Sequence, residues 1–117
     1  MAVNATRSQI ITYTGDVTGV ETISAAANAA SPGSVEIKTL SSGANTITVP
    51  TGGTTPTACT ILPPTGNTVT ITLKGVTGDT GVGLHLTDPT TVALAAATAT
   101  FVLTTSNTLT GIRLYWS

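Results

Sequence analysis

The residues with the most chemical potential lie close together, in the stretch NTVTITLKGVTGDTGVGLHLTDP at positions 67–89. This stretch holds the only histidine of the chain, His85, together with Lys74, Asp79 and Asp88. A serine nucleophile activated by the histidine and oriented by an aspartate is the chemistry that such a set suggests. No Gly-x-Ser-x-Gly turn marks a nucleophile, however, and the sequence alternation places His85 on the outward phase of a strand. We therefore expect His85 to be an exposed polar residue and the protein not to be an enzyme.

Two further kinds of chemistry depend on Cys59 and on the aspartates. Cys59 lies in the apolar run TACTIL, which predicts a buried, unreactive thiol. Asp79 in its Gly-Asp-Thr-Gly turn, or Asp88 before a proline, offers oxygen ligands to calcium, but neither loop supplies the several carboxylates that such a site requires. Aspartate and glycine are also the ordinary residues of tight turns. We therefore expect no metal and no cofactor.

The segments that position these residues alternate apolar and polar residues with a period of two, which is typical of half-buried antiparallel strands. In segment 35–40, Val35 and Ile37 are predicted to face inward, with Glu36 and Lys38 outward. Three more strands are predicted with their inward residues as follows: 45–49 (Ile47, Val49), 67–74 (Val69, Ile71, Leu73) and 82–87 (Val82, Leu84, Leu86). Threonine occupies most of the outward positions.

Further strands are predicted at 8–14, 57–62, 98–104 and 108–117, the last with Gly111 as a bulge. About seven or eight short strands, separated by turns rich in glycine and proline, indicate an all-β fold. We predict an antiparallel β-sandwich, jelly-roll or immunoglobulin-like, over residues 35–117. Residues 24–34, SAAANAASPGS, are interpreted as a linker, so that residues 1–34 form an N-terminal arm or add an extra strand.

Charge is scarce in this chain. Charged residues make up 8% of the 117 positions, against roughly 25% in an ordinary soluble domain, while threonine occurs 28 times. A net charge of −1 gives no basic patch, so we expect no nucleic-acid partner. No apolar run is long enough for a membrane helix or a signal peptide, so we expect no membrane association and assembly in the cytoplasm. A surface with so few charges favours close contact with other protein, and we expect a homo-oligomer.

Three stretches resemble a known class of proteins in their composition and in their succession of strands and turns: GANTITVP, TACTILPPTGNTVTITLKGVTGDTGVGLHL and LTGIRLYWS. In these strand–turn–strand stretches the chain resembles small β-sandwich structural proteins of tailed-bacteriophage virions, of the capsid decoration (cement) or head and tail accessory type. The resemblance implies a non-enzymatic protein of the virion that binds the major capsid protein and stabilises the capsid, commonly as a trimer. It also implies that the N-terminal segment anchors the protein. The alternative is a tail-tip, fibre or adhesin-type module that binds a host-surface receptor or carbohydrate.

Two groups of residues are the candidate partner contacts. Arg7, Ile10 and Tyr13 lie in the N-terminal segment, which the resemblance places on the capsid. Lys74, Asp79 and His85 belong to the hairpin expected from 67 to 87, with Lys74 and His85 on the outer phase at its two strand ends and Asp79 at its tip. The pairing of that hairpin is expected to bring Lys74 and His85 near each other on one exposed face.

Overall fold

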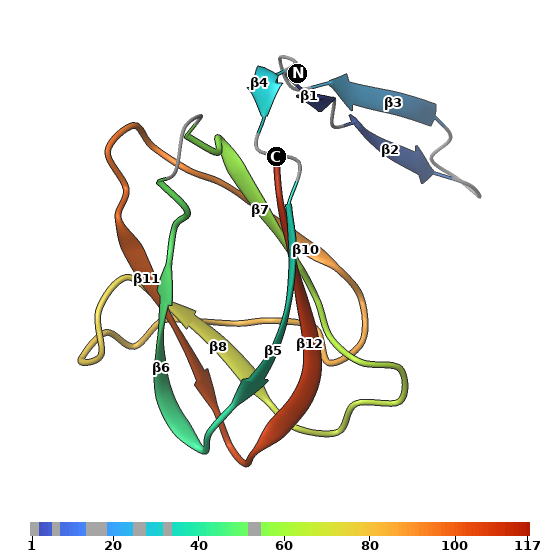
Figure 1. The fold of residues 1–117 in the computed structure, drawn as a ribbon. Coiled ribbons are helices and arrows are strands. Elements are labelled where there is room, and N and C mark those ends of the chain that lie inside the picture. Colours follow the sequence, from blue (N-terminus) through green and yellow to red (C-terminus); the bar gives the residue numbers. More distant parts are fainter. Residues whose placement is uncertain (1–2, 6–7, 14–18, 25–27, 32–33, 52–54) are drawn as a thin grey trace.

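Residues 3–5, 8–13, 19–24, 28–31, 34–51 and 55–117 are described in the computed structural model of the protein, with side chains from residue 34 onward. Every regular element in these ranges is a β-strand, so the predicted all-β class is confirmed (Figure 1). Among these residues there is no helix with the length and apolar character needed to span a bilayer.

Eight strands form a sandwich of two antiparallel sheets, as predicted. Their bounds are β5 (Val35–Leu40), β6 (Gly43–Thr48), β7 (Ala58–Leu62), β8 (Ile71–Lys74), β9 (Val82–Gly83), β10 (Thr90–Ala93), β11 (Thr100–Thr105) and β12 (Leu109–Trp116). One sheet has the order β10-β7-β12-β5 and the other β6-β11-β8-β9. The sequence pattern did not identify β10, because its four residues, TTVA, give only one apolar side chain that packs on the core.

The order in which the strands pair defines the topology. β8 pairs with β9, β7 with β10, β6 with β11, and β5 with β12, so each pair encloses the previous one in the sequence. This is one long antiparallel ribbon, folded at the β8–β9 turn and wrapped into two sheets, which is the jelly-roll arrangement. Two further pairings, β12 with β7 and β11 with β8, join the wrapped ribbon into sheets. Of the two sandwich types that the sequence left open, the pairing selects the jelly roll.

The core between the sheets is aliphatic with one aromatic pair. Phe101 on β11 and Trp116 on β12 lie 6.2 Å apart between ring centroids, one from each sheet. Around them pack the other buried apolar side chains of the cluster: Leu40, Ile47, Val49, Cys59, Ile61, Ile71, Leu103, Leu109, Ile112 and Leu114. These include Ile47 and Val49, the predicted inward residues of 45–49, so the alternation was assigned correctly there.

A bulge interrupts β12 at the predicted glycine. The register between β12 and β5 shifts between Thr110 and Ile112, so Gly111 is the extra residue. Its φ of +87° lies in the left-handed region that glycine adopts without strain. The bulge brings Leu109 and Ile112 to the same buried side of the strand, which strict alternation does not allow.

Strand β5 is oriented opposite to the prediction. Val35 and Ile37 are 52% and 68% exposed, whereas Glu36 and Lys38 lie on the inward face and form an ion pair of 3.4 Å between Nζ and Oε2. The physical reason is Leu40, which is buried in the core and shares its face with Glu36 and Lys38. Because β5 is the edge strand of its sheet, the two charged side chains reach solvent at the open side of the sandwich.

For segment 82–87 the prediction of three buried side chains is wrong at two positions. The strand is only two residues long, and Val82 and Leu86 are exposed, while Leu84 packs against the core as predicted. Once β9 ends, the chain leaves the sheet and the period of two no longer decides which side chain is buried.

Four short strands precede the sandwich: β1 (Val3–Ala5), β2 (Ser8–Tyr13), β3 (Gly19–Ser24) and β4 (Asn28–Ser31). In the described part of the chain β1 pairs with β4 and β2 with β3, and none of them joins a sheet of the sandwich (Figure 1). The segment interpreted as a linker, 24–34, therefore contains strand β4. The division into an arm of residues 1–34 and a sandwich of 35–117 stays a prediction.

Candidate functional site

The turn between β8 and β9 is built around Asp79. Its Oδ2 accepts hydrogen bonds from the backbone N–H groups of Gly75 at 3.1 Å and Val76 at 3.0 Å, and the N–H of Asp79 donates to the carbonyl of Val76 at 3.2 Å. An aspartate in a turn commonly satisfies backbone donors in this way. Asp79 therefore holds the turn, and its lone pairs are partly used within the chain.

His85 has a comparable structural role in the next loop. Its Nδ1 accepts hydrogen bonds from the backbone N–H groups of Asp88 at 2.9 Å and Thr87 at 3.2 Å. Because Nδ1 is the acceptor, the neutral ring carries its proton on Nε2. The Asp88 carboxylate lies 3.7 Å from the same nitrogen, and both side chains are exposed. The prediction that His85 is an exposed polar residue is confirmed.

The expected meeting of Lys74 and His85 is wrong. The hairpin itself forms, with Thr72 opposite Gly83 and Leu73 opposite Val82. The N–H of Leu84 donates to the carbonyl of Ile71 at the start of β8, so His85 lies beyond that end, whereas Lys74 lies at the other end beside the turn. Lys74 and His85 therefore lie at opposite ends of the short β8–β9 hairpin and are not opposite each other in it.

Lys74 and Asp79 do share one feature, a cavity of about 660 Å³ where the β8–β9 turn meets the loop between β10 and β11. Leu94 and Phe101 contribute to its wall, which is mainly apolar. Such a hollow accommodates an apolar side chain or a small ligand. It contains one ammonium group and one carboxylate that already holds a turn, which is not a set of groups that suggests acid–base or nucleophilic chemistry.

The N-terminal candidates are located only in part. Arg7 lies outside the described residues. Ile10 and Tyr13 lie in strand β2, which pairs with β3 so that Ile10 is opposite Thr22 and Tyr13 opposite Gly19. Their contacts with a partner stay a prediction.

Cys59 is fully buried in the core on β7, as predicted. Burial, with a smaller contribution from the negative charge of Glu36, raises the pKa of the Cys59 thiol from 9.0 to about 12. A thiol that keeps its proton and has no access to solvent is a poor nucleophile and a poor metal ligand. In the parts of the chain described above, no three His, Cys, Asp or Glu side chains are grouped so as to hold a metal ion.

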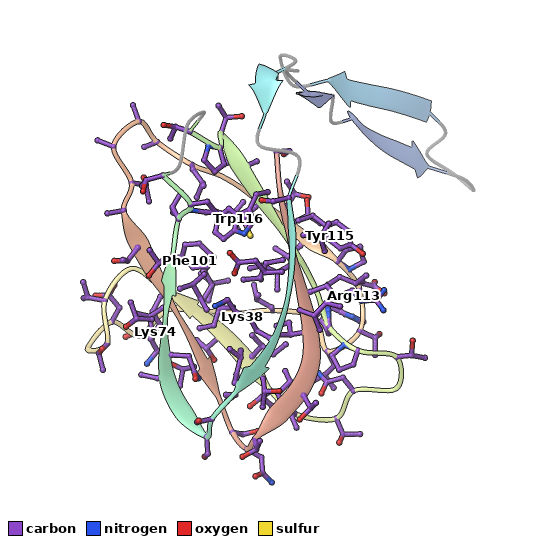
Figure 2. All side chains as sticks on the ribbon, viewed as in Figure 1. Lys38, Lys74, Phe101, Arg113, Tyr115 and Trp116 are labelled. Carbon is purple, nitrogen blue, oxygen red and sulfur yellow. The ribbon has the colours of Figure 1, made fainter. Side chains whose placement is uncertain are left out.

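A surface that the sequence pattern missed lies on the outer side of the β10-β7-β12-β5 sheet. Val35 is opposite Tyr115, Ile37 is opposite Arg113, and Arg113 is opposite Leu62 on the next strand. We call these five residues, Val35, Ile37, Leu62, Arg113 and Tyr115, the Tyr115 face. Figure 2 shows Tyr115 and Arg113 on the side of β12 that points away from Phe101 and Trp116.

The composition of the Tyr115 face is that of a protein contact. Tyrosine and arginine are enriched where proteins bind one another, and Ile37 is the most exposed of the large apolar side chains in the described residues. Among the residues that the structure describes, no carboxylate lies within salt-bridge distance of Arg113. The guanidinium is therefore available, within the described structure, to a partner's acceptor.

The opposite outer surface, on the β6-β11-β8-β9 sheet, is different. Its exposed residues on β6 are Ala44, Thr46 and Thr48, and Thr104 lies opposite Thr72 where β11 pairs with β8. This surface has the threonine outer face that the alternation predicted. Among the described residues, Tyr115 and the most exposed of the large apolar side chains, Ile37, both lie on the Tyr115 face, so the two outer surfaces differ chemically.

One signal for the Tyr115 face was present in the sequence. Arg113 and Tyr115 alternate with the inward residues of the last strand, so their outward phase follows from the pattern. Val35 and Ile37 gave the opposite signal, since an apolar residue in an alternating strand is normally assigned to the core.

Comparison with known proteins adds no relative to this picture. No protein-family model, no curated protein and no solved structure matches the chain.

Proposed function

We propose that the protein is a non-enzymatic structural protein of a tailed-bacteriophage virion, most specifically a capsid decoration protein that binds the capsid surface and stabilises it. The observation that carries the proposal is the Tyr115 face. One sheet presents two exposed aliphatic side chains, a tyrosine and an arginine without an ion-pair partner among the described residues, on a domain with very few other charges. These are the properties of a surface that is covered by another protein.

The polar residues that were the candidates for catalysis favour the same conclusion. Asp79 and His85 each accept two backbone hydrogen bonds in a turn, and Cys59 is buried with a raised pKa. Their roles are accounted for by the fold. The jelly roll is consistent with the proposal but does not carry it, because this fold serves many functions.

In this proposal the N-terminal segment and the Tyr115 face act together. The resemblance to decoration proteins supports anchoring by the N-terminal residues, including Arg7, Ile10 and Tyr13. The Tyr115 face then supplies a flat second contact on the major capsid protein. The threonine face on the other side of the sandwich points to solvent, since hydroxyl groups are well hydrated and make few strong contacts.

The first experiment counts copies of the chain in virus particles purified from a lysate of the cells that produce it, by quantitative mass spectrometry. A decoration protein is expected in numbers comparable to those of the major capsid protein, because it occupies every equivalent position of a symmetric lattice. A few copies per particle would favour the alternative, a tail-tip or fibre module that binds a host-surface receptor or carbohydrate. Absence from the particles would contradict both.

The second experiment adds the purified protein back to particles made without it. The protein is expected to bind and to raise the temperature at which the capsids lose their DNA. Arg113→Ala and Tyr115→Ala are each expected to weaken binding about tenfold or more, because tyrosine and arginine dominate the energy of such contacts. Thr46→Ala and Thr48→Ala on the opposite face are the matched controls and are expected to bind normally. Equal binding by all four variants would exclude the Tyr115 face.

A further inference from the structure

The free edge of strand β5 is the feature that carries an inference beyond a capsid contact. β5 is the last strand of the β10-β7-β12-β5 sheet, and within the described residues it pairs only with β12. The N–H of Trp116 donates to the carbonyl of Ser34 at 2.9 Å, and the register continues from there with Leu114 opposite Glu36. Because backbone groups alternate in direction along a strand, Ser34, Glu36 and Lys38 direct theirs toward β12. Val35, Ile37 and Thr39 therefore direct theirs away from the sheet.

An open edge of this kind pairs readily with another strand unless something prevents it. The usual protections are charged side chains and proline. The side chains of β5 on the outer face of the sheet are Val35, Ile37 and Thr39, which are uncharged and offer no protection. The only charges are Glu36 and Lys38, which face inward and form a pair with each other. A strand added at this edge has to place something favourable opposite these two charges.

We propose that the edge pairs with β5 of a second copy of this chain, antiparallel and with Ile37 opposite Ile37 of the other copy. In this register Glu36 lies opposite the second copy's Lys38, and Lys38 opposite the second copy's Glu36. Val35 lies opposite the second copy's Thr39. The residues whose backbone groups point away from β12, at the free edge, are therefore opposite one another in the two copies. Three such residue pairs exchange about six backbone hydrogen bonds across the edge.

The charges also select this register over its neighbours. A shift of two residues in one direction places Glu36 opposite Glu36 of the other copy, and a shift in the other direction places Lys38 opposite Lys38. Like charges directly opposite each other destabilise a strand pair, and opposite charges stabilise it. A shift by one residue would pair inward faces with outward ones. An unrelated strand without the complementary order of charges is disfavoured for the same reason, which makes a second copy the best partner.

The resulting assembly is a two-fold dimer with one continuous eight-stranded sheet. Its axis is perpendicular to the sheet, so the Tyr115 faces of the two copies lie on the same side. The proposal does not rest on the virion function, and it differs from the trimer that the resemblance to decoration proteins implies. Its test is therefore made with the full-length protein alone.

The test is a charge-exchange experiment read out as mass by analytical ultracentrifugation, at concentrations up to the order of 100 µM, since small interfaces have affinities as weak as micromolar. The wild-type protein is expected at twice the chain mass of 11.6 kDa. Glu36→Lys alone and Lys38→Glu alone are each expected to be monomers, because each places like charges opposite each other. An equimolar mixture of the two variants is expected to form a heterodimer, because every Lys of one copy then meets a Glu of the other.

The mixture separates pairing between chains from the ion pair within one chain, because that internal pair is absent from both variants. If the wild-type protein is a monomer or a trimer, or if the mixture stays monomeric, the proposal is wrong. Ile37→Lys gives a second test, with the expected result of a folded monomer, since Ile37 is exposed and two lysines would meet at the axis. Thr91→Lys, at the opposite edge of the same sheet, is its control and is expected to remain a dimer.

Discussion

At the scale of single residues, the polar side chains of this protein act mainly on its own backbone. The carboxylate of Asp79 and the imidazole of His85 each accept two backbone N–H groups in an exposed loop. The sequence predicted a turn residue at Asp79 and an exposed polar residue at His85, but it did not predict which backbone groups the two side chains bind. That distinction depends on which donors lie within 3 Å or so of the side chain, and the turn conformation decides this.

His85 gives the first prediction. Replacing His85 by alanine removes the acceptor for two backbone donors and is expected to lower the free energy of unfolding by about 1 kcal/mol while the domain stays folded. His85→Asn is the matched control, because the asparagine Oδ1 takes a place close to that of Nδ1 and is expected to recover most of the loss. Urea denaturation of both variants measures the difference. Collapse of the fold in His85→Ala would mean that the side chain packs on the core.

Gly81 gives the second prediction, which concerns backbone space. Its φ is +75°, and an added Cβ would lie 2.6 Å from the carbonyl oxygen of Leu73. Gly81→Ala is expected to lower the free energy of unfolding by about 1–3 kcal/mol, from the strained conformation and the contact together. Gly66 has a similar φ of +71° with no atom within 4 Å, so Gly66→Ala should show the conformational cost alone. Equal losses in the two variants would mean that the β8–β9 turn moves to make room.

Cys59 gives the third prediction, a dependence of stability on pH. Its pKa is raised from 9.0 to about 12, so the folded state holds the thiol proton more tightly than the unfolded state does. The resulting stability is fully present below pH 9 and is lost as the pH rises toward 12, by up to about 1.4 kcal/mol per pH unit. The measurement is the free energy of unfolding of the wild-type protein and of Cys59→Ala over this range. The wild-type advantage is expected to shrink with rising pH, and parallel curves would contradict it.

At the scale of elements, the sequence predicted most of the strands but not all of their faces. Alternation divides a strand into two sides, and a consistently apolar side, as in the last strand with Ile112, Leu114 and Trp116, identifies the core. In β5 the two signals conflict, because Val35 and Ile37 occupy one phase and Leu40 the other. The core contact of Leu40 decides the outcome, and that contact depends on the pairing with β12, which no local pattern contains. For this reason the sequence did not predict the Tyr115 face, which depends on Val35 and Ile37 of β5 lying beside Arg113 and Tyr115 of β12.

The N-terminal segment gives the fourth prediction. A chain that begins at Ser34 keeps every strand of the jelly roll and the hydrogen bond from Trp116 to Ser34, whereas β1 to β4 pair only with one another in the described structure. It is expected to fold, with a circular-dichroism spectrum typical of β-structure, and to lose binding to particles. Binding by the shortened protein would show that the Tyr115 face is sufficient, and failure to fold would show that residues 1–33 belong to the sandwich.

At the scale of the whole molecule, the two proposals reinforce each other without depending on each other. A dimer through β5 presents two Tyr115 faces in the same direction, and a partner with repeated sites, such as a capsid lattice, engages both. Bivalent binding raises the apparent affinity even when each contact is weak. The monomeric variant Ile37→Lys is therefore expected to bind particles more weakly than the dimer, although Ile37 itself contributes to the face and Thr91→Lys remains the necessary comparison.

The nested pairing of the strands also has a consequence for how the chain is made. The first strand of the sandwich, β5, pairs with the last, β12 (Figure 1), and Trp116 at the end of β12 is buried in the core. The β10-β7-β12-β5 sheet is complete only after β12 has left the ribosome, so the two sheets can pack together only after all eight strands have been made. Folds dominated by such distant pairings also close slowly. During that interval the apolar strands of newly made chains are exposed to one another, and a chain cut off before β12 would leave β5 and β7 without the strand that lies between them.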